Sequence, residues 1–101
     1  MNGIEVVDRG SQTRLIFQPV LDIMGARHLY STLNTVLAQA KPVELDASRI
    51  ERVDTAALQL VAAFCRAAHD AGLALHWQGV SPALTEAVTL LGLSQTLGQP
   101  T

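Results

Sequence analysis

The sequence lacks most of the features that would place a protein in a functional class at once. With one cysteine in 101 residues, no intramolecular disulfide can form, which favours a reducing compartment. The net charge is −2 and no basic run occurs, so no nucleic-acid-binding surface is expected. No apolar stretch approaches the roughly 18 residues of a membrane span, so no membrane insertion is expected. The first residues carry acids and no basic n-region, unlike a signal peptide, so we expect a cytoplasmic protein.

Sequence patterns for catalysis are equally scarce. No Gly-rich phosphate loop, nucleophile elbow or triad spacing occurs, and the three histidines show no metal-ligand spacing with cysteine or acids. Cys65 lies on the apolar side of a predicted helix and is expected to be a buried, inert thiol. We therefore predict a protein without enzymatic activity, cofactor or metal. One alternative stays open: Asp46 and Asp54 both lie near strand ends that should open on the same rim, and they could together hold a divalent ion.

The residues that are present indicate one ordered domain. Hydrophobic residues make up 49% of the chain and charged residues only 16%, which argues against disorder. A chain of this length can bury one core without staples. We expect residues 1–101 to be a single domain in which 94–101 is a short tail that makes one last turn and then frays. So apolar a small domain also suggests that a partner covers part of its surface.

Alternating and β-branched residues predict four strands. Residues 4–7 and 13–18, separated by a polar turn, indicate a hairpin, and Pro19 ends the second strand. The third strand covers 43–45 and ends at Asp46, and the fourth covers 73–77. Alternation puts Leu75 and Trp77 on one face of the fourth strand, with Trp77 in the core.

Apolar spacing of three and four residues predicts three main helices. Asp22 is expected to cap the first, which runs to about residue 40, and the second covers 55–71. The third begins with Ser81 as its cap and Pro82 at its first helical position. The predicted inward positions are Ile23, Ala26, Tyr30, Leu33, Leu37 and Ala40; then Ala57, Leu60, Val61, Phe64, Ala68 and Ala71; then Leu84, Ala87, Val88 and Leu91. Ile50 and Val53 are expected to tuck under the sheet. The order β-β-α-β-α-β-α predicts an α/β fold with a four-stranded mixed sheet.

The stretch from Val53 to Leu58 places an acid and a hydroxyl at the start of the second helix. Asp54 can accept hydrogen bonds from the unpaired N–H groups of the first turn. Thr55 is then either part of an ordinary cap or a hydroxyl displayed for modification or contact. Free N–H groups and the helix dipole also suit a phosphate at this position. From these residues alone, both interpretations of Thr55 remain open.

The same region resembles the signature of the STAS domain, the family of anti-sigma factor antagonists. The family pattern is a strand ending in Asp-x-Ser, an apolar spacer, and then Asp-Ser-Ser-Gly-Leu or Asp-Thr-Ala-Gly-Leu opening a helix. Here Asp46-Ala47-Ser48 and Asp54-Thr55-Ala56-Ala57-Leu58 match it. The order of elements over nearly the whole chain is similar too. The resemblance implies a bacterial signal-transduction module without catalytic activity that binds other proteins.

The resemblance also implies roles for individual residues. In anti-sigma factor antagonists a partner anti-sigma factor, a serine/threonine kinase, phosphorylates the hydroxyl after the Asp, which is Thr55 by position. Asp54 would cap the helix and shape the kinase-facing surface, while Asp46 and Ser48 would line the rim. Ala56 and Ala57 depart from the family pattern, since Thr55 is the only hydroxyl of the motif and Ala57 replaces the usual Gly.

A second member of the family is equally similar in this motif. Asp-Thr-Ala resembles the small STAS subunit of the bacterial lipid-asymmetry ABC transporter, where the Thr lies in the contact with the ATPase subunit. That resemblance implies a role in lipid transport, with Thr55 as a contact and not a phosphoacceptor. The oligomeric state does not follow from the sequence.

Overall fold

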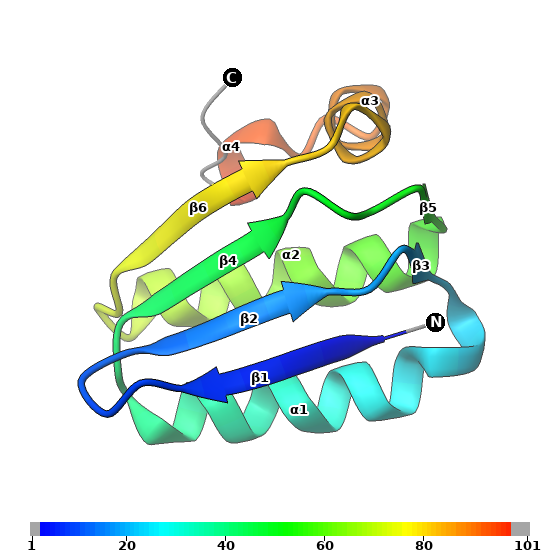
Figure 1. Cartoon of the computed structure of the whole chain (residues 1–101). Coiled ribbons are helices and arrows are strands. Elements are labelled where there is room, and N and C mark those ends of the chain that lie inside the picture. Colours follow the sequence, from blue (N-terminus) through cyan, green and yellow to red (C-terminus); the bar gives the residue numbers. More distant parts are fainter. Residues whose placement is uncertain (1–2, 98–101) are drawn as a thin grey trace.

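One mixed sheet forms the centre of the molecule (Figure 1). The computed structural model describes residues 3–97. The strands are β1 (Ile4–Asp8), β2 (Thr13–Phe17), β4 (Val43–Ala47) and β6 (Leu75–Val80), in the order β1-β2-β4-β6. β1 and β2 are antiparallel, and β2, β4 and β6 run parallel. The predicted four-stranded mixed sheet with an N-terminal hairpin is therefore confirmed.

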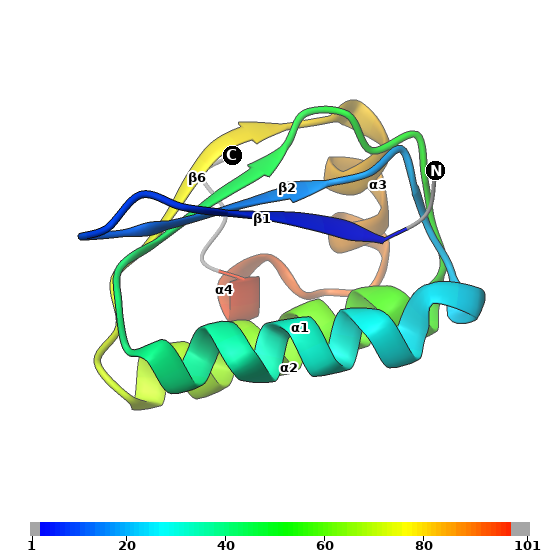
Figure 2. The ribbon, with the colours of Figure 1, turned by 60° about the horizontal axis from the view of Figure 1, so that its bottom comes forward.

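Alternation of side chains gives the sheet one apolar and one polar face. In β4, Val43, Leu45 and Ala47 are buried, while Glu44 and Asp46 point to the other side and are partly exposed. β2 has the same pattern. Among the described residues, helices cover the apolar face only, and the opposite face is open (Figure 2). We call it the open face.

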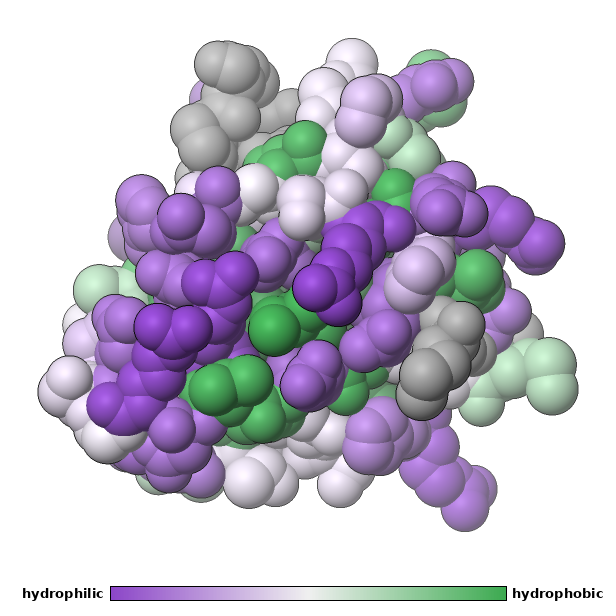
Figure 3. Space-filling view, viewed as in Figure 1, coloured by the Kyte–Doolittle hydropathy of each residue, from purple (hydrophilic) through white to green (hydrophobic). Residues whose placement is uncertain are grey.

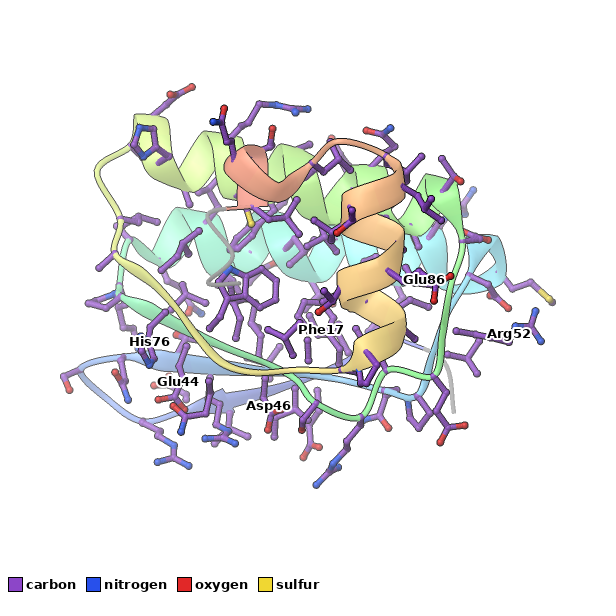
Figure 4. All side chains as sticks on the ribbon, turned by 90° about the horizontal axis from the view of Figure 1, so that it is seen from above. Phe17, Glu44, Asp46, Arg52, His76 and Glu86 are labelled. Atoms are coloured by element: carbon purple, nitrogen blue, oxygen red, sulfur yellow. The ribbon has the colours of Figure 1, made fainter. Side chains whose placement is uncertain are left out.

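Two helices form a layer beneath the sheet. They are α1 (Ala26–Gln39) and α2 (Thr55–Asp70), and they pack against each other along their length (Figure 2). The shorter α3 (Pro82–Leu90) and α4 (Ser94–Leu97) lie at the β6 side, between the sheet and this layer (Figure 4). Ser81 caps α3 as predicted, since its Oγ accepts a hydrogen bond from Leu84 N–H at 3.1 Å. No helix in the described part of the chain is long and apolar enough to cross a bilayer.

The inward face of α1 differs from the predicted one. Of the predicted positions, Leu33 is buried and Leu37 packs against the core, but Tyr30 is 58% exposed and Ala40 is exposed. Leu29 and Val36 are buried instead. The predicted and the observed positions both fit a 3.6-residue period. Packing against α2 and the sheet selects a face that is rotated by about one residue from the predicted face.

The start of α1 also differs from the prediction. Asp22 does not cap the helix directly: its Oδ1 accepts a hydrogen bond from Met24 N–H at 3.0 Å within a short 3-10 turn, η1 (Ile23–Gly25), that precedes the helix. The predicted inward side chain of Ile23 lies outside the described part of the structure. The helix proper begins four residues after Asp22, because the turn comes between them.

The buried face of α2 is wider than the predicted stripe. Leu58, Ala62 and Cys65 are buried as well, Leu60 is only partly buried, and Ala71 is exposed. α2 is enclosed on several sides because it contacts α1, β6 and α4. Of the four predicted positions of α3, Leu84 and Val88 are buried and Ala87 is partly buried against the core, but Leu91 is 40% exposed.

A second, two-stranded sheet was not predicted. β3 (Val20–Leu21) pairs in parallel with β5 (Arg52–Val53), just before the two main helices begin. Two residues are too few to show alternation in a sequence. As predicted, Ile50 is buried and Val53 packs against the core.

The fourth strand begins and ends later than predicted. Leu73 belongs to the end of α2, because its N–H donates to Ala68 O at 2.9 Å while Gly72 adopts a left-handed φ of 76°. At the other end, the pairing register shifts between Leu45 and Asp46 of β4, which leaves Gln78 of β6 as the extra residue of a bulge, and β6 continues to Val80.

The last described residues complete the core. Trp77 is buried as predicted and stacks on Phe17 with ring centroids 6.5 Å apart. Its indole N–H donates to Leu97 O at 2.9 Å, and the Leu97 side chain is buried. The expected last turn of the tail is thus α4, and it is docked onto the core. The expected fraying concerns 98–101, which lie outside the described residues.

Candidate functional site

Thr55 is the first residue of α2, and its side chain is exposed. Asp54 precedes it with extended backbone (φ −91°, ψ 165°), and its Oδ1 accepts a hydrogen bond from Ala57 N–H at 2.9 Å. Asp54 is therefore the N-cap of the helix, as predicted from the sequence. The carboxylate satisfies the helix end, and the neighbouring Thr55 remains accessible to solvent.

The small second sheet fixes the position of this helix start. Asp54 N–H donates to Leu21 O at 2.9 Å, and Pro19 O accepts hydrogen bonds from the N–H groups of Glu51 and Arg52 at 2.7 and 3.0 Å. The chain enters α2 from a strand that is hydrogen-bonded to the segment before α1. Thr55 is consequently held in place by backbone contacts to a distant part of the sequence.

The two alanines of the motif have different environments. Ala57, which stands where the family pattern has Gly, is fully buried and belongs to the hydrophobic core. Its methyl group fills space in the interior of this chain. Ala56 is exposed next to Thr55 and adds an apolar surface atom beside the hydroxyl.

The side chains of Asp46 and Ser48 belong to a network on the open face of the sheet. Asp46 Oδ1 accepts hydrogen bonds from Ser48 N–H at 3.0 Å and Ser48 Oγ at 2.7 Å. Its Oδ2 lies 2.8 Å from Nη2 of Arg14, whose Nη1 lies 2.6 Å from Oε1 of Glu44. Figure 4 shows Glu44, Asp46 and His76 on the side of the sheet away from the helices. Polar residues dominate this face, with smaller apolar areas between them (Figure 3).

The network keeps the Asp46 carboxylate ionised. Partial burial by itself would raise the pKa of Asp46, since a charge is costly to desolvate. The hydrogen bonds from the Ser48 hydroxyl and N–H and the Arg14 guanidinium outweigh that effect, so the pKa lies below the ordinary value. Asp46 is thus a structural anion that holds Ser48 and the loop leading to β5.

Gly79 allows the Ser48 loop to approach β6 closely. It pairs with Asp46 across the bulge, and a Cβ at position 79 would lie 3.1 Å from Ser48 Cβ. Any side chain there would press on Ser48.

The structure places Asp46 and Asp54 in different environments. Asp46 points to the open face and pairs with Arg14, whereas Asp54 caps α2 in the helix layer. Within residues 3–97, no group of three or more His, Cys, Asp or Glu side chains is arranged to hold a metal ion. Cys65 is buried, and burial raises its pKa to about 12 despite the nearby Arg66 charge, as suits an inert thiol.

Three residues near the predicted site were not singled out from the sequence. Arg14 is the cation of the Asp46 network. The alternation of residues in β2 shows from the sequence which face Arg14 lies on, but only the pairing of β2 with β4 brings it beside Glu44 and Asp46. Met24 is 87% exposed in η1, which packs against α2. Arg52 is exposed three residues before Thr55 and points away from the core (Figure 4).

Comparison with known proteins adds a family assignment. The family model described as "Mlab, STAS domain" matches residues 4–99. A comparison with curated protein sequences finds no significant match.

Several solved structures share the fold. An anti-sigma factor antagonist from Mycobacterium paratuberculosis is similar with a TM-score of 0.76 and 22% identity, over 97% of this chain and 85% of the other. The antagonist SpoIIAA in its unphosphorylated form has a TM-score of 0.76 and 15% identity, over 91% and 83%. A STAS domain protein from Planctomyces limnophilus has a TM-score of 0.73 and 19% identity, over 95% and 86%. At these identities the similarity establishes the fold.

Proposed function

Because the chain belongs to the STAS domain family, we propose that it is a non-catalytic regulatory module that binds a partner protein through the start of α2. We call this region the Thr55 surface; it comprises Thr55, Ala56, Gln59 and the neighbouring Met24 and Arg52. The observation that carries the proposal is the exposure of Thr55 beside a carboxylate that caps the helix. The hydroxyl is displayed on a rigid helix start, where it can contact a partner.

The chemistry of the Thr55 surface suits a protein partner. Met24, at 87% exposure, offers a flexible apolar side chain. Its burial by a partner would stabilise the complex, because apolar surface is removed from water. Arg52 supplies an exposed cation that can pair with an acidic group of the partner. A central apolar contact with a polar rim is the usual composition of a protein interface.

Phosphorylation of Thr55 is the proposed means of control. A phosphate adds a charge of about −1.5 to −2 at neutral pH. The helix dipole and free N–H groups tolerate that charge in the unbound protein. In a docked complex the phosphate would have to be desolvated and would repel acidic partner groups, so binding is lost. One antagonist of similar fold was solved in a form described as unphosphorylated, which supports proposing such a switch here.

Labelling by a cognate kinase tests this mechanism. The protein is incubated with its anti-sigma factor kinase and radiolabelled ATP, as wild type, Thr55→Ala and Thr89→Ala. Thr89 is an exposed threonine on α3 and serves as the matched control. We expect label on wild type and Thr89→Ala and none on Thr55→Ala. Equal labelling of Thr55→Ala and wild type would refute the phosphoacceptor role.

The second candidate is an accessory subunit of a phospholipid-transport ABC ATPase. It is favoured by the Asp54-Thr55-Ala56 motif and by the family description that names Mlab. Here the contact would continue from Thr55 along exposed residues of α2, including Gln59 and Arg66. A separate, mainly apolar groove of about 210 Å³ lies between α1 and α2 and is lined in part by Leu37, Leu60 and Ala63.

Co-purification distinguishes the two candidates. A tagged chain that brings down a transporter ATPase supports the subunit role, and a histidine-kinase-like ATPase supports the antagonist role. Arg66→Glu should weaken only the complex with the transporter ATPase, whereas Thr55→Glu should weaken both complexes. In either role we propose a bacterial cytoplasmic protein that binds protein and not nucleic acid.

A further inference from the structure

We propose that the outer edge of β1 is a second interaction surface, at which two copies of this chain pair as an antiparallel homodimer. β1 is an edge strand of the sheet, and no other described element lies beyond it in the sheet plane (Figures 1 and 2). Val6, in the middle of the strand, is 42% exposed although its side chain belongs to the apolar face. The edge shares no residue with the Thr55 surface.

The register with β2 determines which backbone groups are free. Gly3 O accepts from Gln18 N–H at 3.0 Å, and Arg9 N–H donates to Gln12 O at 2.9 Å. Between these two hydrogen bonds, Glu5 lies opposite Ile16 and Val7 lies opposite Arg14. Odd-numbered residues of β1 therefore bond to β2, and the N–H and C=O groups of Ile4, Val6 and Asp8 point outward. Those groups form the unpaired edge.

One pairing register makes this edge complementary to itself. If Val6 of each copy exchanges backbone hydrogen bonds with Asp8 of the other, Val7 lies opposite its own counterpart. Glu5 of each copy then lies opposite Arg9 of the other, and both side chains are on the open face. Glu5 and Arg9 are exposed, and neither forms an ion pair with a described residue. Other registers lack this match. Sliding one copy by two residues puts Glu5 opposite Val7, and sliding it by four residues in the same direction puts Glu5 opposite Glu5.

The edge has only some of the features that keep natural edges apart. Asp8 is a charged residue on the apolar face, but Lys41 compensates its charge through an ion pair at 2.9 Å. Its five residues, Ile-Glu-Val-Val-Asp, include no proline and no lysine, and its pairing with β2 has no bulge. By contrast, the pairing of β6 with β4 at the opposite side of the sheet contains a bulge. A regular, β-branched and uncapped edge favours addition of a further strand, and the paired charges select a second copy of this chain as that strand.

Charge exchange provides the test, with the dimerisation of the full chain measured by analytical ultracentrifugation. Glu5→Arg places two arginine side chains opposite each other, and Arg9→Glu places two glutamate side chains opposite each other. Each variant alone should therefore dimerise at least about tenfold more weakly than wild type. The double variant Glu5→Arg/Arg9→Glu should dimerise like wild type. An equimolar mixture of the two single variants should form a heterodimer, because opposite charges then face each other again.

Two results would overturn the proposal. One is a wild-type chain that remains monomeric up to about 1 mM, the weakest affinity expected of a specific contact. The other is a dimer that neither single charge variant weakens, because it must then use another surface.

A backbone variant supplies an independent check. Val6→Pro removes an outward N–H but no hydrogen bond to β2, and proline is tolerated in edge strands. We expect this variant to keep its circular dichroism spectrum and to lose dimerisation. A folded Val6→Pro chain that dimerises like wild type contradicts pairing through this edge.

Discussion

Two adjacent residues at the start of α2 have separate tasks. Asp54 stabilises the helix through its Oδ1 bond to Ala57 N–H, whereas Thr55 is exposed and available for contacts outside the fold. Stability and binding can therefore be changed independently at neighbouring positions. This separation suits the proposed docking surface, because a partner or a phosphate acting on Thr55 would leave the helix cap in place.

Removing the cap should destabilise the protein measurably. Asp54→Ala leaves Ala57 N–H without its carboxylate and weakens the interaction with the helix dipole, which costs about 1 kcal/mol. Urea unfolding measures the change in the free energy of unfolding. Asp54→Asn keeps an acceptor oxygen in place and should lose clearly less. Equal losses for the two variants would show that the charge, and not the hydrogen bond, is what matters.

The Asp46 network predicts a specific loss of stability in acid. The folded-state pKa of Asp46 lies below its unfolded value, so the ionised carboxylate contributes stability that is fully present above the unfolded pKa, near 4. That contribution is lost as the pH falls through the lower folded pKa. Asp46→Asn should therefore destabilise the protein at pH 7 and make little difference near pH 2.

Urea unfolding of wild type and Asp46→Asn between pH 7 and 2 gives the comparison. Glu86→Gln is a suitable control, because Glu86 is exposed on α3 and lies outside the Asp46 network. A free-energy difference between wild type and Asp46→Asn that stays constant with pH would contradict the network as the source of the shift.

At the scale of elements, α4 is only one turn long but closes the core. Leu97 is buried and its carbonyl accepts the hydrogen bond of the Trp77 indole.

Leu97→Ala should lower the free energy of unfolding by about 2–5 kcal/mol, as expected for a truncated core leucine. Trp77 is the only tryptophan, so its fluorescence should shift to longer wavelength if the turn detaches. Gln95→Ala, an exposed change in the same turn, should alter neither quantity; a silent Leu97→Ala would show that α4 is not part of the core.

Elements with many residues were predictable and elements with few were not. The 16 residues of α2 repeat the helical period several times, so the presence of the helix follows from the sequence. The two-residue β3 and β5 have no period to detect, yet they position Asp54 through the bond to Leu21 O. The face of α1 was predicted about one residue off, because neighbouring stripes fit the same period and only packing against α2 chooses between them.

At the scale of the whole molecule, one core connects all layers. The buried hydrophobic residues run from Ile4 in β1 to Leu97 in α4 as one cluster between the sheet and the helices. Because these side chains form one cluster, detaching any one element would expose the buried side chains of the others to water. This favours all-or-none unfolding.

The single-domain expectation for residues 1–101 leads to a further test. Thermal unfolding followed by far-UV circular dichroism and by Trp77 fluorescence should give the same midpoint within about 1 °C, since two-state unfolding makes different probes coincide. The first method reports the helices and the second reports the region between β6 and α4. Separate midpoints would show that the C-terminal elements unfold on their own.

The sequence by itself determined the order of the main elements, the mixed sheet with its hairpin and the helix cap at Asp54. These features depend on periodicity and on neighbouring residues, which a linear sequence displays directly. The resemblance of the motif to the STAS signature is what singled out Thr55 as the candidate contact. Only the tertiary structure decided that Asp46 pairs with Arg14 on the open face, that Ala57 is in the core and that Met24 is exposed in the turn beside α2. Those facts depend on contacts between residues far apart in the chain, and strand pairing and helix packing create them.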